Sequence, residues 1–315
     1  MRTFLVTGGA GFIGSHIAQA LVERGDRVRI LDNLSTGLVS NMAEFRDRVE
    51  FIEADVLDAA AVARAMAGVD CAFHEAALAS VPMSVERPLD VHAAGATGTL
   101  TVLDAARRAG VRRVVYAASS AAYGDQPTSS KRESDLPSPI SPYAVAKLCG
   151  EYYCQAFTAT YGLETVALRY FNIFGPRQDP ASPYSAVIPL FITAMLSGQQ
   201  PVVYGDGMQS RDFCYVGNVV RANLLAADAP NVAGRVFNVA NGRSTDLLTL
   251  IGLLNQLLGT DICPKHAPPR VGDVRESMAD IAQTRKFLGY EPEIGFEEGL
   301  RRSIEYYRAV AAKNV

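Results

Sequence analysis

The sequence lacks the features that mark secreted, membrane-spanning and metal-binding proteins. Its five cysteines form an odd set without a C-x-x-C pair, and its four histidines are scattered without ligand spacing. We therefore expect neither a disulfide framework nor a metal site, and a reducing, cytoplasmic location. No charged-then-apolar signal segment precedes the first apolar run, and no apolar run is long enough to span a bilayer, so we expect no membrane association.

An excess of charge of one sign is missing as well. The net charge is −3, and the two signs are interspersed along the chain. This balance predicts no affinity for nucleic acid or for an anionic membrane surface. Hydrophobic residues make up 49% of the chain and charged residues 20%, a composition typical of ordered globular proteins. With 315 residues, the chain is expected to form one large unit with a smaller attached lobe.

What the sequence does contain is an alternation of strands and helices in its first half. Apolar strands are predicted at 3–6, 27–31, 49–52, 71–74, 113–117 and 165–169, and helices at 14–24, 59–67, 89–108 and 142–161. This order predicts an α/β fold: a Rossmann-type, doubly wound parallel sheet with helices on both faces. After Phe174 the chain turns to loops and Gly-rich turns, with helices predicted at 188–196, 219–227, 247–258 and 295–311.

A glycine-rich turn follows the first strand directly. Gly8, Gly11 and Gly14 allow a tight turn, a close approach of the backbone to a pyrophosphate, and close seating of the next helix. That helix then presents free N–H groups and the positive end of its dipole to the phosphates. Asp32 ends the second strand, 18 residues after Gly14. The arrangement predicts a dinucleotide site.

The residues around Asp32 also predict which dinucleotide binds. A carboxylate at this position accepts hydrogen bonds from the adenosine ribose and repels a 2′-phosphate. The segment 33–37 contains no arginine that could receive such a phosphate. NAD is therefore predicted over NADP. Asp55, after the third strand, either contacts the adenine or caps the next helix. We predict an NAD-binding domain at 1–172 and a mixed α/β substrate-binding lobe at 173–315, from which some segments return to the sheet.

A tyrosine and a lysine form the candidate catalytic pair. Tyr143 and Lys147 are four residues apart on one predicted helix, so their side chains share a face. An ammonium beside the phenol and a positively charged nicotinamide ring are both expected to lower the pKa of Tyr143, making it a usable base. Ser119, at the end of the strand before this helix, can share the substrate's proton, and Ser120 is the alternative hydroxyl.

The glycine turn, Asp32, the Ser119-Ser120 pair and the Tyr143–Lys147 pair follow one another along the chain at characteristic separations. The segments Asp55-Val56 and Arg169-Tyr170-Phe171-Asn172 belong to the same series. In this the chain resembles extended short-chain dehydrogenase/reductases, and most of all UDP-hexose 4-epimerases of the short bacterial and archaeal type that accepts 2-acetamido sugars. The resemblance implies NAD as cofactor, a UDP-sugar substrate, and a homodimer formed through the helices at 89–108 and 142–161. It implies cofactor contacts at Gly8, Gly11, Phe12, Ile13, Gly14, Asp32, Asn33, Ser35, Thr36, Gly37, Asp55, Val56, Ala76, Tyr143, Lys147 and Tyr170.

The same resemblance implies a set of substrate contacts. These are Ser80, Ser119, Ser120, Asn172, Ala186, Val187, Val203, Tyr204, Arg211, Arg270, Asp273 and Ser277. Arg211 and Arg270 match the family's diphosphate-binding arginines, whose planar guanidinium groups bind phosphate oxygens two at a time. Asp273 matches a contact to the nucleotide ribose.

The strand-end segment predicts which reaction of the family takes place. Related 4,6-dehydratases carry an Asp-Glu pair there, and decarboxylases of UDP-glucuronate usually carry a Glu. This chain reads Ser-Ser-Ala-Ala-Tyr-Gly at 119–124, without a carboxylate. The resemblance then implies removal and return of a hydride through a 4-keto sugar, which is epimerisation with no net redox change.

The predicted sugar pocket is lined by small residues. Relatives restricted to glucose and galactose commonly place a tyrosine where this chain has Ser277, and the serine leaves room for a 2-acetamido group. Ala186, Ser80 and Ala79 are also small. The predicted substrates are UDP-N-acetylglucosamine and UDP-N-acetylgalactosamine, together with UDP-glucose and UDP-galactose.

Three other readings stay open at this point. The first is a 4-epimerase of unacetylated sugars only, and the second is a 4-epimerase of uronic acids, for which Arg275 would supply a cation. The third is an NAD-sensing regulator without chemistry, although such proteins typically lose the Tyr–Lys pair. Two departures, Ala79 in place of a lysine and Gly95 in place of an asparagine, predict a looser hold on NAD than in many relatives.

Overall fold

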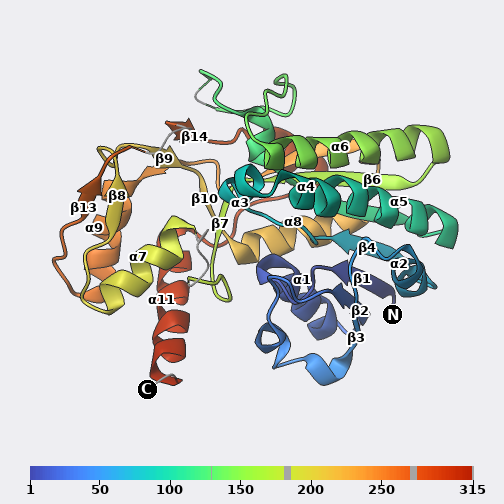
Figure 1. Ribbon diagram of the computed structural model, residues 1–315, viewed down its shortest axis with the longest axis horizontal. Helices are drawn as coiled ribbons and strands as arrows, with labels where there is room; N and C mark the ends of the chain where they lie inside the picture. Colours follow the sequence, from blue (N-terminus) through green and yellow to red (C-terminus); the bar gives the residue numbers. More distant parts are fainter. Residues whose placement is uncertain (129, 181–185, 270–274, 314–315) are drawn as a thin grey trace.

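The computed structural model describes residues 1–128, 130–180, 186–269 and 275–313, and its centre is a seven-stranded parallel sheet (Figure 1). The strand order is β11-β6-β5-β4-β1-β2-β3. The strands are β1 (Thr3–Thr7), β2 (Arg27–Asp32), β3 (Val49–Glu53), β4 (Cys71–His74), β5 (Arg113–Ser119), β6 (Glu164–Tyr170) and β11 (Arg235–Val239). The order reverses between β1 and β4, and ligands bind at such a switch point, outside the carboxyl ends of the strands. The predicted Rossmann-type fold is confirmed.

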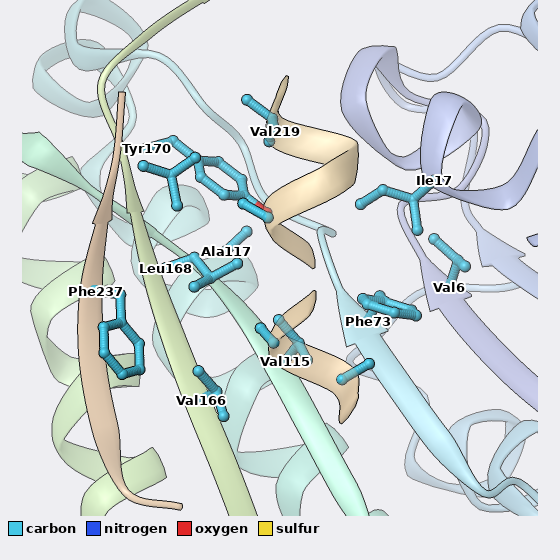
Figure 2. Packing of buried hydrophobic residues seen from close by; sticks show 14 of the residues in the cluster. Val6, Ile17, Phe73, Val115, Ala117, Val166, Leu168, Tyr170, Val219 and Phe237 are labelled. Atoms are coloured by element: carbon cyan, nitrogen blue, oxygen red, sulfur yellow. The ribbon is translucent and has the colours of Figure 1, made fainter. Parts of the chain in front are cut away.

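Helices cover both faces of this sheet. On one face, α1 (Phe12–Glu23) packs beside α8 (Val216–Asp228). Figure 2 shows their contact with the sheet, where Ile17 and Val219 meet strand residues such as Phe73 and Val115. The other face carries α2 (Ala59–Met66), α5 (Gly98–Ala109) and α6 (Pro142–Tyr161). The sheet is thus held between two apolar layers.

The helix predicted at 89–108 is interrupted in the structure. It consists of α4 (Pro88–His92), a π-helical turn (Ala93–Thr97) and α5, preceded by the unpredicted α3 (Val81–Glu86). The π turn contains Gly95, which lies so close to α6 that an added Cβ atom would be 3.0 Å from the Cβ of Ala146. The prediction of one regular helix was therefore wrong, because the contact with α6 coincides with a wider helical turn.

A smaller lobe lies on the left in Figure 1, beside the sheet. Its elements are β7 (Asn172–Phe174), α7 (Val187–Leu196), β8 (Val202–Tyr204), β9 (Ser210–Arg211), β10 (Phe213–Tyr215), β12 (Thr245–Asp246), α9 (Leu247–Leu258), β13 (Lys265–Ala267), β14 (Glu276–Ser277) and α11 (Phe296–Lys313). Its core includes the rings of Phe174, Phe213 and Phe296. Strand β11, α8 and α10 (Ala282–Leu288) follow residue 172 in the sequence but pack with the central sheet.

None of the helices in the described ranges combines the length and the apolar character needed to cross a membrane.

Candidate active site

The glycine turn is built so tightly that side chains do not fit. Gly8 has φ of 68°, and a Cβ atom added there would lie 2.7 Å from the backbone nitrogen of Ala76. A Cβ atom on Gly14 would lie 2.2 Å from the carbonyl oxygen of Gly8. Gly11 precedes the first turn of α1, where no side chain caps the N–H groups. The turn therefore fits a pyrophosphate at a helix amino end.

Asp32 stands at the end of β2, beside this turn. Its carboxylate is buried and accepts hydrogen bonds from the Ala10 N–H at 2.9 Å and the Leu34 N–H at 2.8 Å. A Cβ atom on Gly37 would come within 2.8 Å of its Oδ1 atom, so only glycine leaves that side of the carboxylate open. Asn33 and Ser35 are exposed next to it. A fixed carboxylate at the end of the second strand suits the adenosine ribose of NAD.

The side chain of Asp55 is held by hydrogen bonds at the surface, whereas that of Val56 is buried. The Asp55 carboxylate accepts hydrogen bonds from the Asn33 side chain at 2.7 Å and from the Leu57 N–H at 2.8 Å. The cap of α2 is Asp58, so the alternative that Asp55 caps this helix was wrong. The Val56 side chain is buried against Gly98, which leaves only its backbone for a cofactor contact.

Phe12, Ile13 and Thr36 complete the predicted cofactor contacts near the turn. The side chains of Phe12 and Ile13 pack into the apolar clusters, so they can offer only their N–H groups to a phosphate. Thr36 is exposed.

The Ser–Tyr–Lys set is assembled at the carboxyl end of β5. Helix α6 begins at Pro142 with its amino end capped by Ser141, and this places Tyr143 in the first helical turn. Ser119 is the last residue of β5, and its hydroxyl is hydrogen-bonded to the Tyr143 phenol. Ser120 begins the 3-10 turn that follows. The geometry thus favours Ser119 over Ser120 as the partner of Tyr143.

Burial governs the protonation of this set. It raises the pKa of Tyr143, and the hydrogen bond with Ser119 lowers it by less. Burial also lowers the pKa of Lys147, whose ammonium donates to the Ala117 carbonyl oxygen at 2.7 Å and lies 5.2 Å from the centre of the Tyr116 ring. The expected net lowering of the Tyr143 pKa is therefore wrong for this structure, because burial raises this pKa and the Lys147 ammonium is directed at a strand carbonyl oxygen.

A polar chain beneath the site was missed in the sequence. The Asn223 amide donates to the Tyr170 hydroxyl at 2.7 Å, and this hydroxyl donates to the Glu75 carboxylate at 2.8 Å. Tyr170 was predicted to contact the cofactor, but its hydroxyl is engaged by these two groups. Glu75 directly follows β4, and a carboxylate just beyond a parallel strand is a signal that could have identified it.

Three short strands assemble part of the predicted substrate site. Ser277 in β14 is paired in register with Arg211 in β9, and the Asp212 N–H donates to the Ser277 carbonyl oxygen at 2.7 Å. Asn172 in β7 donates its backbone and side-chain N–H groups to the Asp212 carbonyl oxygen at 3.1 and 3.4 Å. Asn172, Arg211 and Ser277 are therefore brought together from distant parts of the sequence.

The buried Asp212 carboxylate, which sequence reasoning missed, ties further segments to this site. It accepts hydrogen bonds from the backbone of Asn241, Gly242 and Ala279. Burial raises its pKa to about 6.

The remaining predicted substrate residues occupy varied positions. Ser80 caps α3 by accepting a hydrogen bond from the Met83 N–H at 3.1 Å. Val203 is buried in the lobe core, so its backbone alone could face a ligand, whereas its neighbour Tyr204 is half-buried. Ala186 and Val187 lie at the amino end of α7. Arg270 and Asp273 lie outside the described residues.

A phosphate turn at one strand end and a phenol–lysine pair two strands away meet at the same edge of the sheet. This combination defines a dinucleotide-dependent enzyme of the short-chain dehydrogenase/reductase class. The chain belongs to the NAD dependent epimerase/dehydratase family, whose model matches residues 4–240.

Solved structures agree over almost the whole chain. A UDP-N-acetylglucosamine 4-epimerase from Methanobrevibacter ruminantium, in complex with UDP-N-acetylmuramic acid, is 41% identical with a TM-score of 0.94, covering 98% of this chain and 99% of that one. A UDP-glucose 4-epimerase from Thermotoga maritima with UDP-glucose is 39% identical with a TM-score of 0.94, over 98% and 99%. A Thermus thermophilus UDP-glucose 4-epimerase in complex with NAD is 36% identical with a TM-score of 0.89, over 97% and 99%. The present protein is an NAD-dependent isomerase of this nucleotide-sugar 4-epimerase class.

Proposed function

We propose that the enzyme interconverts UDP-N-acetylglucosamine and UDP-N-acetylgalactosamine, as well as UDP-glucose and UDP-galactose, through a 4-keto sugar. The observation that carries this proposal is the position of Ser277, whose small side chain stands beside Arg211 on the neighbouring strand. With Arg211 on the diphosphate, a residue at 277 would border the space in which the sugar turns. A serine there leaves volume for a 2-acetamido group. The small side chains of Ser80 and Ala186 support the same reading.

The catalytic roles follow from the hydrogen bonds around Tyr143. When bound, NAD supplies an acceptor for the hydride on carbon 4 and later a donor for its return. Tyr143 takes the proton of the 4-hydroxyl group and gives it back, with Ser119 orienting the phenol. Lys147 holds a positive charge beside the site, and its bond to the Ala117 carbonyl oxygen fixes its position. The sugar presents its opposite face between the two transfers.

The uronic acid reading finds less support. It needs a free cation near the sugar, and Arg275 was the candidate. The guanidinium of Arg275 pairs with the Asp206 carboxylate at 3.0 Å, and both groups are largely exposed at the surface. Such a pair would have to open before Arg275 could receive a sugar carboxylate.

The substrate proposal is tested by changing the volume at position 277. We expect the Ser277→Tyr variant to lose turnover of the N-acetylated pair and to retain turnover of the unacetylated pair, because a phenol ring would clash with the acetamido group in one of the two sugar orientations. Ser277→Ala, which removes only the hydroxyl, serves as the matched control. Epimer ratios are followed with a panel of UDP-sugars. Equal losses for both pairs would indicate general damage to the site, and an unaffected N-acetylated reaction would remove Ser277 from the pocket.

We also propose that the enzyme forms a homodimer through α5 and α6. Between these helices and α2 runs a groove of about 750 Å³, whose lining includes the apolar side chains of Leu100, Ala156 and Phe157 beside the charged Asp104 and Arg108. Val145 and Tyr152, two turns apart on α6, are each more than half exposed. A second copy of the same two helices would cover this surface by forming a four-helix bundle.

A further inference from the structure

Glu75 is a carboxyl group at the catalytic edge for which the reaction so far has no use. His74, the last residue of β4, is paired with Tyr116 on β5, so Glu75 lies level with Ala117 on that strand. The Ala117 carbonyl oxygen is the group that binds the Lys147 ammonium. Glu75 and Lys147 therefore converge on the same point of the sheet edge from different elements.

The hydrogen bond between Tyr170 and Glu75 favours the ionised form of the carboxyl group. The oxygen of Tyr170 accepts a hydrogen bond from the Asn223 amide, so its own hydrogen is free to point at Glu75. This makes Tyr170 a donor and the Glu75 oxygen an acceptor, as a carboxylate requires. Burial raises the pKa of Glu75 to about 7, and the bond from Tyr170 and the charge of Lys147 limit this rise.

The ionisable groups around Lys147 come from every element packed against it. They are Tyr143 and Glu151 on α6, Tyr116 on β5, and His74 and Glu75 at the end of β4. Two of these groups are carboxyl groups. Glu151 forms a buried two-point ion pair with Arg169, at 2.9 and 2.8 Å, and is neutralised by it. Among the described residues Glu75 forms no ion pair, which leaves it as the unmatched carboxylate beside Lys147.

We propose that Glu75 is a positioning residue whose carboxylate is the counter-charge that keeps Lys147 in its ammonium form at neutral pH. Without this carboxylate, a lysine buried beside Tyr116 would lose its proton more easily, since burial disfavours the charged form. Lys147 would then offer Tyr143 no positive charge. The inference rests on the proposed catalytic role of Lys147, but the coupling between the Glu75 and Lys147 side chains can be measured without turnover.

The direct test measures the titration of Lys147 in the NAD-loaded protein. The chain contains only five lysines, so 13C labelling at lysine Cε gives a simple NMR spectrum in which Lys147→Arg assigns the signal. Glu75→Gln keeps the acceptor for Tyr170 and removes only the charge. We expect it to move the midpoint of Lys147 down by about one pH unit or more, the usual effect of a near charge. The alkaline limb of the kcat–pH profile should move in the same direction.

Glu133→Gln is the matched control. Glu133 is also partly buried and accepts a hydrogen bond from the backbone, but it faces Asn238 and not Lys147. This change should leave the Lys147 midpoint in place. Tyr170→Phe, which removes the hydrogen bond but keeps the Glu75 charge, should lower the midpoint less than Glu75→Gln does. NAD content is measured for each variant, so that cofactor loss is not mistaken for a change in coupling.

An unchanged or raised midpoint in folded, NAD-loaded Glu75→Gln protein would overturn the proposal. Should that variant fail to fold, the reciprocal experiment decides, because the coupling of two charges is symmetric. Lys147→Met should then raise the titration midpoint of Glu75, followed by 13C labelling at glutamate Cδ, with Glu75→Asp used to assign the signal. No movement there would equally overturn it. Inactivity of the wild-type enzyme on UDP-sugars would contradict the proposed function and leave this measurement intact.

Discussion

At the scale of the residue, Tyr143 is held between two opposing effects. Burial favours its neutral form, and the hydrogen bond with Ser119 favours the phenolate. For Tyr143 to act as a base, its phenolate form must therefore be stabilised further by positive charge that lies beside it when the cofactor is bound. Lys147 alone does not supply this in the present structure. The activity of Tyr143 is then expected to depend on the occupied cofactor site.

The first prediction removes the Tyr143 hydroxyl. Tyr143→Phe keeps the ring that packs in the first turn of α6, so fold and NAD content should be unchanged. Epimerisation should fall by about 10²–10⁴-fold, the contribution of a positioned acid–base group. Initial rates with UDP-sugars provide the measurement, and Tyr153→Phe on the same helix provides the control. A loss of less than about tenfold would mean that another group transfers the proton.

At the scale of the element, long regular helices could be predicted from the sequence. The bounds predicted for α6 and α9, 142–161 and 247–258, are those observed. Both helices have a side-chain cap at the amino end, Ser141 and Asp246, and a left-handed glycine after the last turn. Where a helix begins and ends is here determined by single residues at its two ends, and these residues can be recognised in the sequence.

Elements and contacts that depend on tertiary structure could not be predicted in this way. Strands β9 and β14 have two residues each, too few to show a hydrophobic period, and they exist because Arg211 and Ser277 are brought together by the fold. The role of Glu75 depends on which strands are neighbours in the sheet. The direction of the pKa shift of Tyr143 depends on burial, which a spacing of four residues on a helix does not reveal.

The glycine turn allows a prediction at the same scale. A Cβ atom at position 14 would lie 2.2 Å from a carbonyl oxygen, so Gly14→Ala must displace the turn. We expect the purified variant to carry much less NAD than wild type, measured by analysis of the nucleotide released on denaturation. Gly252→Ala is the control, since a Cβ atom there on α9 meets nothing within 4 Å. At this exposed position in the helix, the alanine should stabilise the protein by roughly 0.5–1 kcal/mol. Full NAD content in Gly14→Ala would show that the turn can adapt.

At the scale of the whole molecule, His16 links the first helix to the second lobe. Its Nε2 atom is 3.0 Å from the carbonyl oxygen of Pro176, and burial lowers its pKa to about 4. At pH values between about 4 and 6.5, His16 is protonated in the unfolded chain but stays neutral in the folded protein. Stability from this group is therefore complete above about pH 6.5 and is lost as the pH falls toward 4.

The His16→Gln variant isolates this contribution. A glutamine amide can still donate to Pro176, but it does not titrate. At pH 5 the proton uptake by the unfolded wild-type chain should lower its free energy of unfolding by about 2 kcal/mol relative to pH 7 through this residue alone. Urea denaturation at both pH values should show a smaller decrease for the variant than for wild type. Parallel decreases in the two proteins would mean that His16 is protonated freely in the fold.

The last prediction concerns the assembly. If α5 and α6 of two copies pack together, light scattering should give about twice the single-chain mass of 33.8 kDa. Ala156 lies in the groove between these helices, so Ala156→Arg places a long charged side chain where the partner's helix would pack. Burying that charge without a partner is strongly unfavourable. The variant should therefore shift to the single-chain mass while keeping its fold and its NAD.

The control for the assembly places the same substitution on a distant helix. Ala309 is exposed on α11, in the other lobe, and Ala309→Arg should leave the mass of wild type unchanged. Dissociation should also expose Val145 and Tyr152, so the Ala156→Arg protein is expected to unfold at a lower temperature that depends less on protein concentration. A single-chain mass for wild type would contradict the dimer outright. A doubled mass that persists in Ala156→Arg would place the interface on another surface, because a four-helix bundle of α5 and α6 leaves no room for an arginine at its seam.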